Sequence, residues 1–454
     1  MYLSTLTFTL LVLPLTLLLF YLIPQKAKRV YLLVVGLLLY GFGNPLRVLV
    51  PLTYVLFDYG VGLLLKKAAS HRFLSRSIVM LTAAFQAAVL TAVRLVSDGN
   101  REFLFPLGMA IFTLSGIGYL IGVHRKKHEA ESNILSLALY LTFFPILYAG
   151  PLISYGEFQS QLAKNRHNIV NLGSGIGLFI RGLAEKVVLA DTLGYLFREL
   201  RQTAPASISM LTAWLTVTVF SMYLYFELLG YADMARGLGL CFGITLPKHF
   251  GQPFMTSSVT AFMESWNITH IHWFQVNFRD FLFRNIRHRW TKYASLVLMW
   301  MLIGVWYGTS LQFLLWGLII GILLAAEQFV LGRVIKRNYA FGLLYTGMSL
   351  QFAWVLLFTD SMTEAALYWK AMVGFGAGLA DRFGVYFFTS YIVFLLISFY
   401  IATDLFRNIT ERVAVTAIGR KIASLMPLIE CVLMIFCFAC MLYKRIPAAL
   451  WLQL

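Results

Sequence analysis

Long apolar runs recur from one end of the chain to the other, and they restrict its possible folds more than any other feature. A helix needs about 20 apolar residues to cross the hydrocarbon core of a bilayer. Unpaired backbone groups in lipid cost several kcal/mol, so only helices and closed barrels span membranes. The runs have helical lengths, and the spans that they predict are 3–23, 31–42, 49–65, 78–96, 105–123, 134–148, 210–230, 294–303, 311–324, 342–358, 386–401 and 428–442. We therefore expect an all-α polytopic membrane protein with roughly ten to twelve crossings.

The composition agrees with this prediction, because 59% of the 454 residues are hydrophobic and only 13% are charged. Soluble domains carry about one quarter charged residues. No polar block is long enough to fold separately, so we predict a single membrane domain over 1–454. Two segments, 294–303 and the glycine-interrupted stretch 237–254, are expected to be re-entrant or buried, because irregular backbone at membrane depth needs protein or water around it.

The cations of the chain, which has a net charge of +17, gather at the ends of the expected spans. Three clusters follow the first, third and fifth spans: Lys26, Lys28 and Arg29; Lys66, Lys67, Arg72 and Arg76; Arg125, Lys126 and Lys127. The loops between them carry fewer cations, so the positive-inside rule predicts a multi-pass protein of the plasma (inner) membrane with its N-terminus outside. Membrane lipids explain these cations, and no nucleic-acid partner is expected.

Two further classes of site are not expected. The four cysteines lie in apolar sequence without the paired spacing of a zinc site, so we predict no metal site. The chain also lacks a nucleotide-binding glycine loop with its lysine, which disfavours an ATP-driven pump.

Polar and ionisable residues enter the apolar sequence in the central third of the chain. Such residues are expensive in a membrane and mark a functional hypothesis by default. The candidates for a tunnel or structural role are Glu227, Asp233, Arg236, Arg279, Asp280 and Trp306, and the densest cluster adds Asn267, His270, His272 and Tyr307. Glu227 and Asp233 are expected near a helix end, and an ion pair between Asp233 and Arg236, one turn apart, is the structural alternative to a functional role.

The order of several short motifs resembles a known family, the membrane-bound O-acyltransferases (MBOAT). The motifs are A-G-P at 149–151, E-K-V-V-L-A-D-T-L at 185–193, G-Y-A-D-M-A-R-G-L-G at 230–239, R-D-F at 279–281 and G-V-W-Y-G-T-S at 304–310. The likeness covers roughly residues 30 to 330 and is strongest to the bacterial branch of alginate O-acetylation and teichoic-acid D-alanyl transfer proteins. The first two motifs look more like those of the polysaccharide-acetylating branch.

The resemblance implies a fold and an activity. The expected fold is a ring of tilted helices with re-entrant segments around a central tunnel. Through it an acyl group, here acetyl, passes from a cytoplasmic thioester (acetyl-CoA or an acyl carrier protein) to a hydroxyl of an exported glycan or cell-envelope polymer. A separate extracytoplasmic acyl-transfer partner is expected, and no bound cofactor. A histidine in the tunnel is the expected base, since its pKa of ~6.5 suits neutral operation.

The chain departs from the family at its two histidine positions. The histidine of the family motif W-H-G corresponds to Tyr307, and that of W-H-I-S corresponds to Asn267. A phenol with a pKa of ~10 is a poor base. Either His270 or His272 has taken over the base role, with Asn267 and Tyr307 as oxyanion donors, or the chain keeps the fold as a scaffold or translocation component without transfer chemistry.

The local backbone decides what the two histidines can do together. Two residues apart, they face different directions on a helix, whereas on an extended segment they share a face. Only the extended geometry suits joint catalysis or metal binding. For either histidine, a hydrogen-bonded polar residue in the membrane core is the structural alternative. An ion-coupled transporter would show inverted repeats, and the sequence has no such visible symmetry.

Overall fold

The computed structural model describes residues 3–99, 108–148, 150–164, 168–283 and 288–444. In these ranges the chain forms helices and one isolated β-bridge, between Phe254 and Thr403. The predicted all-α class is therefore confirmed. Ala149, the first residue of the A-G-P motif, and 105–107, the start of the fifth expected span, lie outside the described residues.

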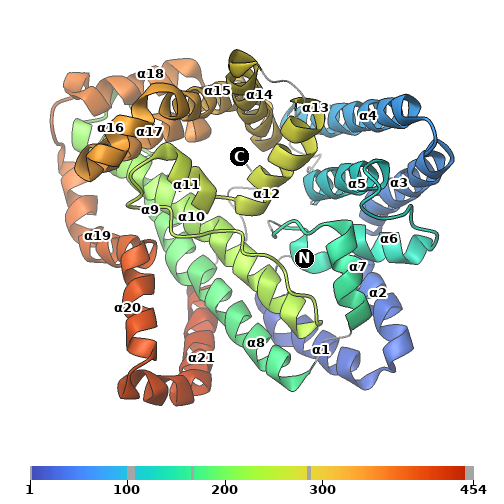
Figure 1. Cartoon of the computed structure of the whole chain (residues 1–454). Helices are drawn as coiled ribbons and strands as arrows, with labels where there is room; N and C mark the ends of the chain where they lie inside the picture. Colours follow the sequence, from blue (N-terminus) through green and yellow to red (C-terminus); the bar gives the residue numbers. More distant parts are fainter. Residues whose placement is uncertain (1–2, 100–107, 149, 165–167, 284–287, 445–454) are drawn as a thin grey trace. The chain divides into compact units, whose positions relative to one another are not determined.

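Contacts between Cα atoms divide the chain into two compact units. Figure 1 labels the helices of both units. Unit 1 comprises Met1–Phe179 and Tyr231–Lys248, and unit 2 comprises Ile180–Gly230 and His249–Leu454. Unit 1 contains α1 (Leu13–Leu22), α2 (Lys28–Tyr40), α3 (Leu49–Lys67), α4 (Arg72–Gly99), α5 (Met109–His124), α6 (Ile134–Leu141) and α7 (Tyr155–Lys164). The helices α8 (Ile169–Ala184) and α10 (Met210–Cys241) have residues in both units. The single membrane domain and the ring around a tunnel stay predictions.

Unit 2 holds the remaining helices. They are α9 (Asp191–Leu200), α11 (Val259–Ser265), α12 (Ile268–Phe274), α13 (Asp280–Phe283), α14 (Arg289–Tyr307), α15 (Leu311–Ala326), α16 (Gly332–Arg337), α17 (Tyr339–Phe358), α18 (Met362–Lys370), α19 (Arg382–Ile401), α20 (Asp404–Ala414) and α21 (Ala417–Lys444). Several run directly into π-helical turns, such as Glu185–Ala190 between α8 and α9 and Gln275–Arg279 between α12 and α13.

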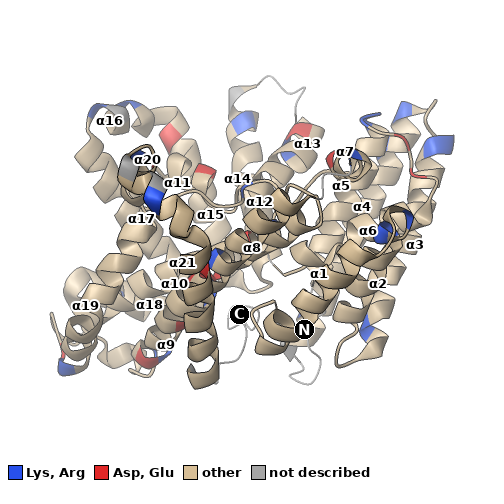
Figure 2. Ribbon diagram, turned by 90° about the horizontal axis from the view of Figure 1, so that it is seen from below, with Lys and Arg blue, Asp and Glu red and all other residues tan. Residues whose placement is uncertain are grey.

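Seven helices in the described part are long and apolar enough to cross a membrane. They are Pro45–Lys67, Arg72–Ser97, Met210–Cys241, Leu311–Ile335, Tyr339–Phe358, Arg382–Ile401 and Lys421–Tyr443, and three shorter apolar helices cover Phe8–Leu22, Met109–His124 and Ile134–Ile146. Figure 2 shows that charged residues lie mainly near helix ends, while the helix bodies are mostly uncharged. The chain is thus a multi-pass membrane protein, as predicted.

Two expected helix boundaries were wrong. The run 294–303 lies inside the 19-residue helix α14, because Lys292 before it and Gly304 after it limit the apolar run without interrupting the helical backbone. The span 210–230 continues to Cys241, so Glu227 lies inside α10 and not near its end. Gly230 does not end the helix but allows close packing, since a Cβ atom there would lie 2.7 Å from the carbonyl oxygen of Gly182.

Helices α14 and α15 pack backbone against backbone through glycines. A Cβ atom on Gly304 would lie 2.2 Å from the carbonyl oxygen of Phe313, and one on Gly317 would lie 2.2 Å from that of Trp300. Small residues at helix interfaces allow such close approach in membrane proteins. This packing positions Tyr307, the last residue of α14, next to the residues described below.

Gly317→Ala is expected to destabilise the protein, because the added methyl group meets backbone that cannot move away as a side chain would. Overpacking of this kind costs about 1–3 kcal/mol. The measurement is the thermal unfolding midpoint in detergent. Gly347→Ala, within α17, is the matched control because its Cβ would meet nothing within 4 Å. Equal midpoints for the two variants would contradict the prediction.

Candidate active site

Asn267 stands between two short helices of unit 2, and its backbone conformation allows the site to form. It is the N-cap of α12 with φ of 47° and ψ of 44°, in the left-handed region that asparagine tolerates better than most residues. The preceding helix α11 is held at its start by the carboxylate of Glu327, which accepts hydrogen bonds from the backbone N–H groups of Val259 at 2.7 Å and Thr260 at 2.9 Å. Glu327 therefore anchors the helix that leads into the turn at Asn267.

The side chains of Asn267, His270, Tyr307, His249 and Thr269 form one hydrogen-bonded cluster in unit 2. The Asn267 amide nitrogen donates to the Tyr307 hydroxyl, and its amide oxygen faces Nδ1 of His270. Nε2 of His249 lies 3.1 Å from the same Nδ1, and Nδ1 of His249 is hydrogen-bonded to the Thr269 hydroxyl at 2.7 Å. The structure thus joins three of the four residues predicted for catalysis.

The Asn267 amide oxygen faces Nδ1 of His270, and Nε2 of His249 lies 3.1 Å from the same atom. The tautomer with the proton on Nδ1 lets His270 donate to Asn267 and leaves the lone pair on Nε2. His270 is buried, and its Nε2 atom has no hydrogen-bond partner among the described residues. Burial lowers the pKa of the imidazole, so the ring is neutral at pH 7. The site therefore presents a buried, neutral nitrogen with a free lone pair.

His272 does not belong to this cluster. The two histidines lie on the α-helix α12, where His270 is buried and His272 is exposed. The alternative of an extended segment with both rings on one face was therefore wrong, and the two rings face different directions on the helix. The two histidines lie on a helix because Asn267 is its N-cap, so that helical backbone begins at Ile268.

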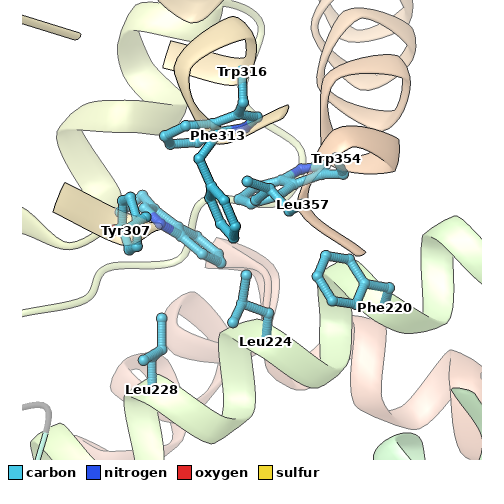
Figure 3. A pocket seen from close by; sticks show the side chains of 9 residues that line it. Phe220, Leu224, Leu228, Tyr307, Phe313, Trp316, Trp354 and Leu357 are labelled. Atoms are coloured by element: carbon cyan, nitrogen blue, oxygen red, sulfur yellow. The ribbon is translucent and has the colours of Figure 1, made fainter. Parts of the chain in front are cut away.

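A small apolar cavity adjoins Tyr307. It measures about 40 Å³, the space of about three water molecules. Its walls are Phe220, Leu224, Leu228, Trp266, Tyr307, Phe313, Trp316, Trp354 and Leu357. In Figure 3 Tyr307 lies on one side of the space and the α10 residues Leu224 and Phe220 lie below it. Tyr307 therefore belongs both to the hydrogen-bonded cluster and to the wall of the apolar cavity.

Glu227 takes part in a buried ion cluster that the sequence did not predict. It is fully buried, and its Oε2 lies 2.9 Å from Nζ of Lys186, which also contacts Oδ1 of Asp191 at 2.5 Å. In the sequence, Lys186 is only one residue of the motif at 185–193, and nothing there indicates its partners. Charges that are distant in sequence can be matched only when the fold brings them together.

Among the described contacts of the other predicted polar residues, only that of Trp306 is with a member of the His270 cluster. Asp233 and Arg236 form the expected ion pair at 2.7 Å, in unit 1. Arg279 donates to the Ser295 hydroxyl at 3.4 Å, and Asp280 is exposed at the start of α13. Trp306 is the exception, because its ring centroid lies 4.8 Å from that of His270.

His249 is the member of the cluster that sequence reasoning missed. It lies in the irregular stretch between α10 and α11 and is 2% exposed. Its backbone carbonyl also accepts from the N–H of Ile268 at 2.8 Å. The available signal was a histidine between Lys248 and Phe250 in a stretch with proline and glycine, and this pattern alone does not distinguish a site residue from a packing residue.

Helices of membrane-spanning length and a buried histidine, amide and phenol cluster define this chain as a polytopic membrane protein with an internal polar site. The model of the membrane-bound O-acyltransferase family (MBOAT) matches residues 98–360, more than half of the chain, and the chain belongs to this family. The predicted family is thereby confirmed.

Three named relatives match between 49% and 89% of this chain. A probable alginate O-acetylase of Pseudomonas putida is 27% identical over 440 residues, covering 89% of this chain and 88% of the relative. A peptidoglycan O-acetyltransferase of Helicobacter pylori is 26% identical over 76% of this chain and 74% of its own length. A teichoic acid D-alanyltransferase of Bacillus subtilis is 26% identical over 49% of this chain and 59% of its own.

Proposed function

We propose that this chain is a membrane O-acyltransferase that moves an acetyl group from a cytoplasmic thioester to a hydroxyl of an exported glycan or another cell-envelope polymer. The donor in this proposal is acetyl-CoA or an acyl carrier protein. Family membership supports the reaction class, and the relatives named as O-acetylating enzymes match more of the chain than the D-alanyltransferase does. The small cavity beside Tyr307 favours a short acyl group over a long one.

The observation that carries the proposal is the buried Nε2 atom of His270, which has no hydrogen-bond partner among the described residues and holds a lone pair in the tautomer that donates to Asn267. An alcohol is a poor nucleophile until a positioned base takes its proton. In the proposed step the acceptor hydroxyl gives its proton to Nε2 while its oxygen attacks the thioester carbonyl carbon. A C–O bond forms, the negative charge moves to the carbonyl oxygen, and its return breaks the C–S bond. The leaving thiolate takes the proton back from His270.

Tyr307 and Asn267 have different roles in this proposal. The Tyr307 oxygen accepts from Asn267, so the phenol's own proton stays available to stabilise the oxyanion. Both ends of the Asn267 amide are occupied, by Tyr307 and by His270, so Asn267 is a positioning residue. Trp306 packs on the His270 ring and limits its rotation.

The topology remains part of the proposal. The basic clusters around Lys28, Lys66 and Lys126 face the cytoplasm of a plasma (inner) membrane, and the N-terminus is outside. A separate extracytoplasmic acyl-transfer protein is the proposed partner. These assignments rest on the charge distribution and on family resemblance.

The test compares membranes that contain the full chain with membranes that lack it. Each receives acetyl-CoA or an acetylated carrier protein, with D-alanyl carrier protein as the competing donor, and free thiol and labelled envelope polymer are measured. We expect thiol release and label from the acetyl donors only when the chain is present. Equal signals with and without the chain, for every donor, would reject catalysis.

A non-catalytic scaffold or translocation component is the second candidate. It is favoured by Tyr307 and Asn267, which stand where the family resemblance implies histidines. A scaffold would leave thiol release unchanged in isolated membranes while its deletion would still reduce polymer acetylation in cells. The two readouts in the experiment therefore separate the candidates.

A further inference from the structure

A carboxyl group is buried inside unit 1, far along the sequence from the proposed active site. Asp58 lies in α3 and is 0% exposed. Its Oδ1 accepts a hydrogen bond of 2.6 Å from the amide nitrogen of Gln86 on α4, which is 3% exposed. Its Oδ2 lies against α5, since a Cβ atom on Gly116 would be only 2.0 Å from it. Three helices thus enclose this carboxyl group.

Asp58 differs from the other deeply buried acids in the described part of the chain. Glu227 has the ammonium group of Lys186 at 2.9 Å. Glu327 accepts hydrogen bonds from two backbone N–H groups and a hydroxyl. Asp58 has one neutral amide and belongs to none of the ion pairs described for this chain. An ionised carboxylate in such a place is strongly disfavoured, and such groups neutralise instead.

Two oxygen atoms of this pair lack a donor. Oδ2 of Asp58 and Oε1 of Gln86 are both buried and have no hydrogen-bond partner among the described residues. An ionised Asp58 leaves both of them unsatisfied, because each can only accept. A proton on Oδ2 turns this atom from an acceptor into a donor. Protonation of Asp58 therefore removes one unpartnered acceptor and, with it, a buried charge that no cation balances among the described ion pairs.

The groups that face Asp58 offer no charge to compensate an ionised form. The titratable side chains that act on it are Tyr54 on α3 itself, Tyr119 on α5 and Tyr140 on α6, and α4 contributes Gln86. These phenols are neutral near pH 7. Arg47, in the turn before α3, is eleven residues away, about 16 Å along a helix.

We propose that Asp58 is a proton-binding site: near neutral pH its carboxyl group is a neutral acid that pairs with the Gln86 amide inside the α3, α4 and α5 bundle. The ligand is a proton, bound at Oδ2. This proposal does not depend on the proposed acyl transfer, and it is the same whether the chain is an enzyme or a scaffold.

Difference infrared spectroscopy on the purified full chain tests directly whether Asp58 carries a proton. The spectrum of wild type minus Asp58→Asn at neutral pH is expected to contain the carbonyl band of a protonated carboxylic acid, shifted to lower frequency in D₂O. Asp233→Asn is the matched control, because Asp233 pairs with Arg236 at 2.7 Å and its difference spectrum should contain ionised carboxylate bands. Carboxylate bands in place of the acid band for Asp58 would overturn the proposal.

The unfolding midpoint gives a second, independent test. An asparagine amide has the shape and the donor of a protonated aspartate, so Asp58→Asn should unfold within about 3 °C of wild type. Gln86→Leu removes the partner and should lower the midpoint by more than that. An Asp58→Asn protein that fails to fold, or that loses more than about 10 °C, would also overturn the proposal.

Discussion

Replacing His270 with alanine is expected to lower acyl transfer by about 10²–10⁴-fold, the usual contribution of a general base. The variant loses the buried Nε2 lone pair, while Asn267 still bonds to Tyr307. The measurement is the rate of thiol release from acetyl-CoA or acetylated carrier protein in membranes with matched protein levels. Since only neutral imidazole accepts a proton and burial lowers the pKa of His270, the wild-type rate should persist well below pH ~6.5.

His272→Ala is the matched control for this prediction. His272 lies on the same short helix, two residues later, but it is exposed and outside the cluster. We expect its rate to stay close to wild type. Equal loss in the two variants would point to damage to α12, and no loss in either would remove His270 from the reaction. His270→Gln, which keeps a polar group of similar size, should restore stability but not rate.

Replacing Lys186 with methionine is expected to destabilise unit 2 by about 3–5 kcal/mol, the usual effect of removing one partner of a buried ion pair. The change leaves the carboxylate of Glu227, which is 0% exposed, without its cation. Asp191 loses the same partner but is 15% exposed and reaches water. The free energy of unfolding in detergent, or the thermal midpoint, measures the effect.

The double variant Lys186→Met with Glu227→Met separates a buried charge from lost packing. When both members of a buried pair become apolar, the cost is often small. We therefore expect the double variant to recover most of the stability lost in Lys186→Met. A double variant that is less stable than the single one would mean that the pair is needed for packing rather than for charge balance.

The helical class and the membrane setting could be predicted because they depend on local sequence. A run of apolar residues of spanning length has few alternatives to a helix in lipid. Helix ends were harder to predict, as α10 shows: Gly230 reads as a stop in sequence but serves close contact with Gly182. A glycine can end a helix or allow two helices to pack closely, and the sequence does not show which helix lies opposite it.

The candidate site was predicted in part. Asn267, His270 and Tyr307 were named from the sequence because polar residues in apolar surroundings stand out. His249 was missed, and His272 was included, because one sequence does not reveal which side chains face each other. The same limit applies to Asp58 and Gln86, which are 28 residues apart and meet only when α3 packs against α4.

By itself the sequence determined that this chain is a helical membrane protein, and its motif order identified the family, since both depend on residues near each other along the chain. The tertiary structure alone decided which polar groups meet: His270 with His249 and Asn267, Lys186 with Glu227, and Asp58 with Gln86. The physical reason is that a buried polar atom must find its partner in space, and that partner usually lies on another segment.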